Sequence, residues 1–367
     1  MERVLVTGAG GYIGTTLVPM LLEAGYGVRA VDRFFFGDRL LAEHPALERL
    51  REDTRLLGPE HLEGINHVID LAAVSNDPSG ELFEQATWEI NHLARARLAR
   101  LAKAAGVQRY ILPSSCSIYG FQPDEVFCTE THPVNPLSTY ARANVAAERD
   151  VLPLADEDFC VVVLRQATLY GYSPRMRFDL AINGMTWGAW STGRLPLMRD
   201  GTQWRPMVHV RDTAAAQLFM LSAPPERVSG QVFNVASQEN NYQLGSLGEL
   251  VQSAMPRRPA IEWYGDPDRR SYRVTSERIE ALGWRARYTA VDGVREIVER
   301  LEAGTLSRTI ETITLDWYRE LVTWHARIRE LERNDGILDI AGTEHLVAEA
   351  SRARPGSSRA HRAPPSG

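Results

Sequence analysis

The chain has 367 residues, a formal net charge of −6, 44% hydrophobic residues and 24% charged residues. This composition is typical of a globular protein with one large domain or two. It gives no indication of a nucleic-acid partner, and no apolar run is long enough to span a membrane. The three cysteines have no metal-ligand spacing and the chain begins without a signal-peptide pattern, so we expect no metal site and a cytoplasmic protein.

The first fourteen residues predict a turn that binds a dinucleotide. The apolar run 3–6 is typical of a buried strand, glycines follow at Gly8, Gly11 and Gly14, and residues 15–24 carry apolar side chains at helical spacing. Without side chains at the first two glycines, the backbone can approach a pyrophosphate. The N–H groups at the start of the helix would then bind that anion.

A second strand is predicted over residues 27–31, and Asp32 follows it directly. A carboxylate at this point accepts both hydroxyls of the adenosine ribose and repels a 2′-phosphate, which favours NAD over NADP. Arg33, directly behind it, weakens that preference. The alternative is a glycine turn that binds no ligand.

Strands and helices continue to alternate up to residue 164, which predicts a doubly wound parallel α/β sheet of the Rossmann type. The domain would cover residues 1–170, with 208–237 returning to it. The pattern predicts helices over 38–51, 83–105 and within 136–152, and strands over 67–73, 109–112 and 159–164.

The regular alternation ends at residue 164. We expect residues 171–207 and 238–300 to form a smaller α/β lobe that binds the substrate over the carboxyl ends of the strands. Residues 301–340 predict a helical extension, with Trp317, Leu321 and Trp324 on one stripe that packs on the domain or on a partner. The composition of residues 341–367 is typical of a disordered tail.

Several motifs, in this order, resemble the extended short-chain dehydrogenase/reductase family, and within it the nucleotide-sugar epimerases and dehydratases. They are TGAGGYIG, Asp32, Asp53-Thr54, Leu71-Ala72-Ala73, Asn91 in WEINH, SSCSIYG and PLSTYARAN, and the resemblance covers residues 1–285. It implies that NAD is the cofactor. Contacts to the cofactor are then implied for Gly8, Gly11, Tyr12, Ile13, Gly14, Asp32, Asp53, Thr54, Leu71, Ala72, Ala73, Asn91, Tyr140 and Asn144.

The resemblance also implies the catalytic residues. Ser115 would hydrogen-bond the reacting hydroxyl and Tyr140 would be the general acid/base. The family places a lysine four residues after the tyrosine, and this chain has Asn144 there. An amide can hydrogen-bond a ribose but carries no charge to lower the pKa of a tyrosine. The chain's one lysine, Lys103, lies on a different predicted helix.

Two departures from the family's motifs bear on the reaction and the substrate, and so do two arginines. Dehydratases of the family carry Thr-Asp-Glu where this chain has Ser115-Cys116-Ser117, and elimination of water needs those carboxylates. The resemblance therefore favours an epimerase over a dehydratase. The alternatives are a nucleotide-sugar dehydrogenase or ketoreductase, and a non-catalytic NAD-binding protein. Arg205 and Arg270 match arginines that bind the nucleotide diphosphate, and Thr168 stands where the family has a substrate-binding asparagine.

The resemblance implies a homodimer as well. Its interface would be formed by the helices over 83–105 and 140–152, and we expect their outer faces to carry apolar side chains. Those side chains are Leu93, Leu98, Val145 and Val151.

Overall fold

The computed structural model describes residues 1–333 and divides into two units, Met1–Leu315 and a second that begins at Asp316. In the second unit the described residues belong to helix α12 (Thr314–Arg333). The predicted tail over 341–367 lies outside the described residues. No helix in the described part of the chain has the length and apolar character needed to cross a membrane.

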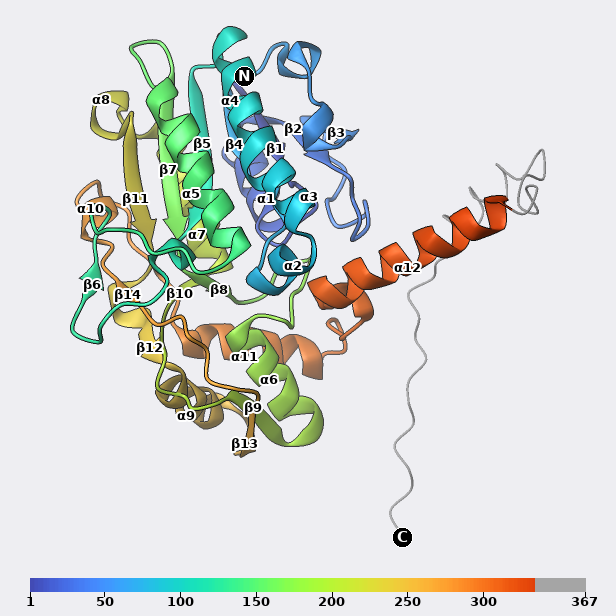
Figure 1. Ribbon diagram of the computed structural model, residues 1–367, viewed down its shortest axis with the longest axis vertical. Coiled ribbons are helices and arrows are strands. Elements are labelled where there is room, and N and C mark those ends of the chain that lie inside the picture. Colours follow the sequence, from blue (N-terminus) through green and yellow to red (C-terminus); the bar gives the residue numbers. More distant parts are fainter. Residues whose placement is uncertain (334–367) are drawn as a thin grey trace. The chain divides into compact units, whose positions relative to one another are not determined.

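The first unit is built on a seven-stranded parallel sheet, drawn in Figure 1, with the order β11-β7-β5-β4-β1-β2-β3. The chain runs outward from β1 to one edge and then returns to fill the other side of β1, which confirms a doubly wound α/β fold. The point where the direction reverses lies between β1 and β4. The strands are β1 (Arg3–Thr7), β2 (Gly27–Asp32), β3 (Leu47–Arg51), β4 (His67–Asp70), β5 (Arg109–Ser115), β7 (Cys160–Gln166) and β11 (Gln231–Val235).

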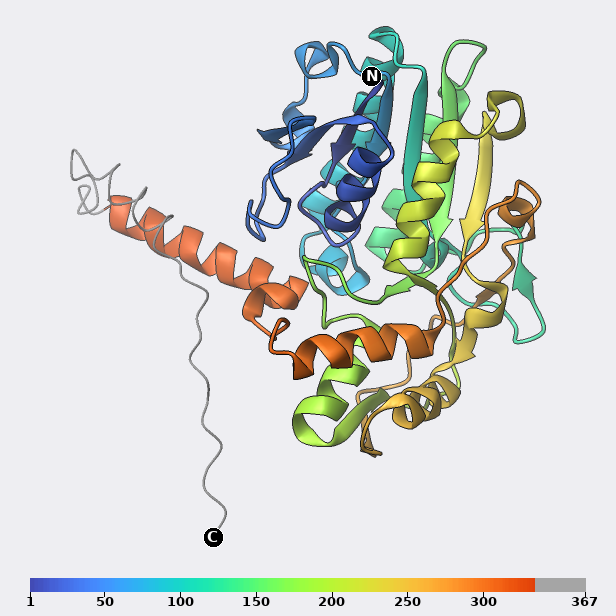
Figure 2. The same cartoon turned by 180° about the vertical axis from the view of Figure 1, so that it is seen from behind.

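Helices cover both faces of the sheet (Figures 1 and 2). On one face α1 (Gly14–Glu23) and α7 (Val210–Ser222) bury side chains such as Leu17 and Ala214 against the strands. On the other, α4 (Arg95–Ala104) and α5 (Thr139–Val151) pack through small side chains. Because both faces are covered, the central strands are buried and mainly apolar, with polar residues such as Asp70 and Arg165 near their carboxyl ends.

The helix predicted over 38–51 is wrong. Residues 47–51 form the edge strand β3, which pairs in parallel with β2 so that Leu50 lies opposite Val31. Pro45 interrupts the preceding segment, since it has no N–H to donate and disfavours helix in the residue before it. The edge strand therefore starts only after the proline.

The helix predicted over 83–105 is present as a helical run from Glu84 to Ala104, but it is irregular and a separate short helix precedes it. Two short helices, α2 (Asp77–Leu82) and α3 (Glu84–Trp88), meet at Phe83, whose backbone is not helical. A π-helical turn follows over Glu89–Ala94 and leads into α4. Such wide turns are often found at functional sites because they shift the side chains that come after them.

A smaller lobe lies beyond the carboxyl ends of the sheet strands (Figure 1). It has its own core, in which Ile182, Leu195, Leu247 and Val294 are fully buried. Its main elements are β8 (Thr168–Tyr170), α6 (Ala181–Thr192), β9 (Arg194–Met198), β10 (Trp204–His209), β12 (Asn241–Gln243), α9 (Leu244–Ala254), β13 (Ala260–Tyr264) and α11 (Ala290–Glu302). Shorter elements are β6 (Phe127–Cys128), which pairs with β14 (Arg273–Val274), α8 (Pro225–Val228) and α10 (Glu277–Glu280).

The prediction that four apolar side chains lie on the outer faces of the dimer helices is partly wrong. Leu98 and Val151 are fully buried in the core between α4, α5 and the sheet. Leu93 is 56% exposed and Val145 is partly buried against the core. Leu93 and Leu98 are five residues apart, and because a helical turn takes about 3.6 residues the two side chains do not share a face. Val151, the last residue of α5, packs inward beside Leu98 in the same core.

Candidate active site

The turn between β1 and α1 fits the pyrophosphate of a dinucleotide. Gly8 has a φ of +65°, and a Cβ there would lie 2.8 Å from the backbone nitrogen of Ala72. A Cβ at Gly14 would lie 2.4 Å from the Gly8 carbonyl oxygen. These two glycines therefore allow the turn to pack on the protein, while Gly11 leaves the surface of the turn open. The first N–H groups of α1 point out of the helix at this place.

Tyr12 and Ile13 belong to the same turn, and the side chain of Tyr12 points toward the smaller lobe. Its hydroxyl donates to the carbonyl of Gly171 at 2.5 Å and accepts from the amide of Asn183 at 3.1 Å. Burial raises the pKa of Tyr12 far above the usual range. What Tyr12 and Ile13 offer a dinucleotide is therefore their backbone N–H groups, and the tyrosine ring tethers the turn to the lobe.

Asp32 lies at the carboxyl end of β2, beside the glycine turn. Its carboxylate accepts from the N–H of Gly10 at 3.0 Å and from the N–H of Phe34 at 2.6 Å, which fixes its orientation. Burial raises the pKa of Asp32, and the two N–H donors act against that rise. Arg33 donates to Asp53 at 3.1 Å, so its charge is balanced by a carboxylate.

Asp53 and Thr54 lie beside this pair. Asp53 also accepts from Arg55 at 2.8 Å, and hydrogen bonds from Arg55 hold the pKa of Asp53 below its usual range. Thr54 is buried, and its hydroxyl has no hydrogen-bond partner among residues 1–333. A buried hydroxyl without a partner, next to the proposed adenosine site, is consistent with a ligand at this place.

The carboxyl end of β4 forms the next part of the site. Leu71, Ala72 and Ala73 are half-buried. Asn91 on the π-helical turn is fully buried, accepts from the N–H of Val74 at 2.8 Å and donates to its carbonyl at 3.0 Å. Both ends of the Asn91 amide are thus used to hold the loop that follows β4.

Ser115 and Tyr140 come together across the ends of β5 and α5. The side chain of Ser115 accepts from the N–H of Ser117 at 3.1 Å, and it lies close enough to Tyr140 to lower the pKa of the phenol. Ser138 caps α5 by accepting from the N–H of Ala141 at 3.2 Å, which places Tyr140 in the first turn. The pair is therefore positioned by a strand end and a capped helix end, both of which are rigid.

Five influences set the pKa of Tyr140, and the balance raises it. Burial is the largest, because it disfavours the phenolate. The charge of Arg95 lowers the pKa and the charge of Asp77 raises it, while hydrogen bonds from Ser115 and Asn144 lower it. A permanent cation therefore acts on this tyrosine although the expected lysine is missing.

Sequence reasoning missed Arg95. It is 3% exposed at the start of α4, and its guanidinium donates to Asn144 Oδ1 at 3.0 Å and to the carbonyl of Ala72 at 3.2 Å. It lies four residues after Asn91 and so on the same inward face, which is the signal that was available. Lys103, at the other end of α4, pairs with Asp156 at 2.6 Å.

Arg205 on β10 and Arg270 converge on one carboxylate. Asp268 accepts from Arg205 at 2.8 Å and from Arg270 at 2.5 Å, and Arg270 also pairs with Asp77 on α2. Burial acts to raise the pKa of Asp268, but the two arginines hold it at about 2. Thr168 on β8 lies opposite Met207, two residues along β10 from Arg205. Two guanidinium groups around one anion form an arrangement that also suits a diphosphate.

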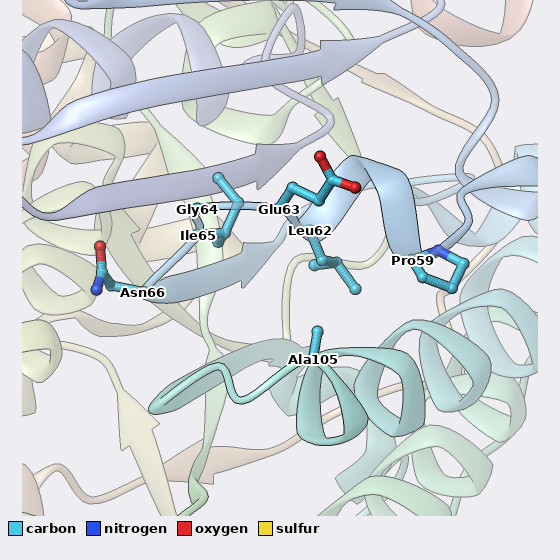
Figure 3. A pocket seen from close by; sticks show the side chains of 7 residues that line it. All are labelled: Pro59, Leu62, Glu63, Gly64, Ile65, Asn66 and Ala105. Atoms are coloured by element: carbon cyan, nitrogen blue, oxygen red, sulfur yellow. The ribbon is translucent and has the colours of Figure 1, made fainter.

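A separate pocket is distant from these residues. It is lined by Pro59, Leu62, Glu63, Gly64, Ile65, Asn66 and Ala105 (Figure 3). These residues lie before β4 and after α4, at the amino end of the strand. Ligands of open α/β sheets bind at the carboxyl ends, so we do not place the active site in this pocket.

Comparison with known proteins agrees with this arrangement. The model of a family described as the NAD dependent epimerase/dehydratase family matches residues 4–236. A UDP-glucose 4-epimerase of Mycolicibacterium smegmatis is 30% identical over 316 residues, which cover 81% of this chain and 97% of that protein.

Solved structures give the same result for the fold. The protein MoeE5, in complex with UDP-glucuronic acid and NAD, matches with a TM-score of 0.73 and 29% identity over 83% of this chain and 100% of that chain. A UDP-glucose 4-epimerase of Thermus thermophilus, in complex with NAD, matches with a TM-score of 0.72 and 23% identity over 82% of this chain and 99% of that chain.

We predict that the protein binds NAD more tightly than NADP, because the Asp32 carboxylate repels a 2′-phosphate and Arg33 is held by Asp53. The substitution Asp32→Asn should lower the ratio of NAD affinity to NADP affinity by about tenfold. Asp38→Asn is the control, since this carboxylate in the same loop is exposed and pairs with Arg51. Calorimetric titration with both dinucleotides measures the ratio, and tighter binding of NADP by the unchanged protein would contradict the prediction.

Proposed function

Because the chain belongs to the NAD dependent epimerase/dehydratase family, we propose that it epimerises a nucleotide-linked sugar by transient oxidation of a carbinol. The enzyme class and the cofactor follow from the family, whose members are NAD-dependent enzymes. The observation that carries the reaction is the placement of Ser115, the last residue of β5, beside Tyr140 in the first turn of α5, where it lowers the pKa of the phenol.

The glycine turn and Asp32 would hold NAD, which supplies a hydride acceptor when it is bound. Tyr140 is the general base that takes the proton from the sugar hydroxyl and returns it as a general acid. The Ser115 hydroxyl hydrogen-bonds the same sugar oxygen and the tyrosine, and so aligns them. Inversion then requires that the oxidised sugar presents its other face before the hydride is returned.

The residues after Ser115 support an epimerase over a dehydratase or a decarboxylase. Cys116 is fully buried and contacts the carbonyl of Arg165 at 3.2 Å, and burial raises the pKa of its thiol far above the usual range. Ser117 is buried and uncharged. Neither residue can act as the carboxylic acid or carboxylate that elimination of water requires.

The substrate is proposed to be a UDP-linked hexose. Arg205 and Arg270 converge on a single anion, which suits the diphosphate of a nucleotide sugar. The M. smegmatis relative is a UDP-glucose 4-epimerase and MoeE5 was solved with UDP-glucuronic acid, which supports the uridine nucleotide and a glucose-derived sugar.

The direct test combines mass spectrometry of the purified protein with NMR of a panel of UDP-sugars. We expect NAD to co-purify and one sugar to be converted into its epimer, and we expect Tyr140→Phe to abolish the conversion because it removes the acid/base. Net accumulation of reduced cofactor would instead indicate a dehydrogenase, and net consumption of added reduced cofactor with a keto-sugar would indicate a ketoreductase. Bound NAD with every sugar unchanged would indicate a non-catalytic NAD-binding protein.

For the diphosphate site, Arg205→Ala or Arg270→Ala should weaken UDP-sugar binding and leave NAD affinity nearly unchanged. Each lost contact to a charged group costs about 1.5–3 kcal/mol, which corresponds to a loss of about tenfold to a hundredfold in affinity. Arg269→Ala is the matched control, because this neighbouring arginine is exposed. An equal loss of UDP-sugar and NAD binding would assign the two arginines to folding and refute the site.

We also propose a homodimer through the outward face of the π-helical turn and α5. Leu93 is 56% exposed there, and His92 and Asp150 join the two elements at 2.7 Å. Light scattering should give a dimer mass at micromolar concentration, and Leu93→Glu should give a monomer because it charges an apolar interface. Leu56→Glu, at an exposed leucine on another turn, is the control. A monomer mass for the unchanged protein would refute the dimer.

A further inference from the structure

The missing lysine leaves a physical requirement that the rest of the site must meet. A tyrosine acts as a base near neutral pH only if something stabilises its phenolate, since its reference pKa is about 10. Burial makes the requirement stricter in this protein, because it raises the pKa of Tyr140. Besides the positively charged nicotinamide ring that NAD would bring, a charge that offsets this rise comes from another element of the fold.

We propose that Arg95 and Asn144 together replace that lysine: Arg95 supplies the positive charge and Asn144 joins it to the helix that carries Tyr140. Arg95 is then a positioning residue, since it acts on the tyrosine through Asn144 and through space. The proposal rests on Tyr140 being the acid/base of the proposed function. It claims less than the proposed reaction does, because it concerns only the pKa of the Tyr140 phenol.

The hydrogen bonds fix the orientation of the Asn144 amide. Arg95 has only donors, so the atom that faces it at 3.0 Å must be the amide oxygen. The amide nitrogen then donates to the carbonyl of Tyr140, one turn earlier on α5, at 2.9 Å. Asn144 is 1% exposed, so water does not compete for these bonds. A lysine at this position would leave Arg95 beside a second cation without an acceptor.

The guanidinium of Arg95 is buried among neutral hydrogen-bond acceptors. Its side chain is 3% exposed, and among residues 1–333 no carboxylate forms an ion pair with it. The acceptors that it contacts are neutral, the carbonyl of Ala72 and the amide of Asn144. A buried cation without a counter-ion costs several kcal/mol in general. Asp70 on β4 is also buried and accepts from Tyr110 at 2.5 Å, and Asp70 and Arg95 shift the pKa of that tyrosine in opposite directions. Among the described residues the guanidinium of Arg95 contacts no carboxylate, so its charge acts on the groups around it, and Tyr140 is one of them.

The π-helical turn explains how the guanidinium reaches this place. Glu89–Ala94 has the wide geometry, and Arg95 is the first residue of α4 after it. On the same inward face Asn91 holds Val74 by two hydrogen bonds. The turn therefore delivers an anchor and a cation to the two sides of the loop after β4.

Other charged groups also face Tyr140. From α2, Asp77 raises its pKa, and Glu81 accepts from the N–H of Thr139 at 2.6 Å. Asp77 is itself paired with Arg270. On α5, Arg142 is exposed and donates to Thr139 at 2.9 Å. Arg95 is thus the cation whose charge lowers the pKa of Tyr140 through space, and it stays charged at every working pH.

The test is a pH titration of the Tyr140 phenol in the NAD-loaded full-length protein, followed by ultraviolet difference absorbance with Tyr140→Phe as the reference. Arg95→Met removes the charge and keeps a similar volume. We expect it to raise the pKa of Tyr140 by about one unit or more, which means about tenfold less phenolate at a given pH. Arg100→Met, an exposed arginine on the same helix, should leave the pKa unchanged. An unchanged pKa in Arg95→Met would overturn the proposal.

A double-mutant cycle separates the electrostatic role from a merely structural one. Asn144→Lys should lower the pKa of Tyr140 strongly in the Arg95→Met background, where it restores the missing charge. In the parent protein the same substitution should lower the pKa of Tyr140 by a smaller amount, because Arg95 is already present and the two cations repel each other. Equal shifts in both backgrounds would overturn the proposal, since they would show that Arg95 and residue 144 act independently.

Arg95→Lys covers the case in which Arg95→Met does not fold. It keeps the charge and loses the second guanidinium contact, so we expect a pKa close to that of the parent. A pKa raised as far as charge removal predicts would overturn the proposal. The titration uses no sugar. If the pKa of Tyr140 shifts as expected in these variants but the unchanged protein converts no UDP-sugar, the proposed reaction is refuted and the role of Arg95 is not.

Discussion

The backbone of one residue, Ala72, holds the active site together. Its N–H donates to the hydroxyl of Thr7 at 3.0 Å, and its carbonyl accepts from Arg95 at 3.2 Å. The glycine turn packs so closely on it that a side chain at Gly8 would meet its nitrogen at 2.8 Å. This contact lies at the reversal point of the sheet, between β1 and β4, where a dinucleotide binds in such folds. Through Arg95 and Asn144 it extends to the helix of Tyr140, so the glycine turn and the proposed acid/base are connected through Ala72.

The site uses arginine for its positive charges, in keeping with a chain in which Lys103 is the one lysine. An arginine stays protonated at any working pH and offers several donors in a fixed plane. This suits Arg205 and Arg270, which share the carboxylate of Asp268, and it suits Arg95, which grips two elements at once. A consequence is that the charge near Tyr140 does not titrate itself. The pH response of the proposed reaction should then be governed by the tyrosine.

Much of the fold could be predicted because its signals are local. The glycine spacing, the apolar strands and the small residues after β4 each lie within one short stretch, and they indicated the parallel sheet and the expected cofactor side. The helix expected over 38–51 failed because β3 is an edge strand defined by its pairing with β2, which no local pattern reveals. The outward placement of Leu98 failed because Leu98 is five residues from the exposed Leu93, too far to share a helix face with it, and it packs into the core instead. The proposed replacement for the missing lysine could not be predicted from the sequence, since Arg95 and Asn144 are 49 residues apart and meet only in the folded chain.

The most direct test of the account is the proposed epimerisation carried out in D₂O, with the product examined by NMR at the inverted carbon. Transient oxidation takes the hydrogen from that carbon as a hydride and returns the same one, so we predict a product that carries no solvent deuterium there. Deuterium at the inverted carbon would show that the carbon is deprotonated and reprotonated instead. That result would contradict the proposed roles of NAD, Ser115 and Tyr140.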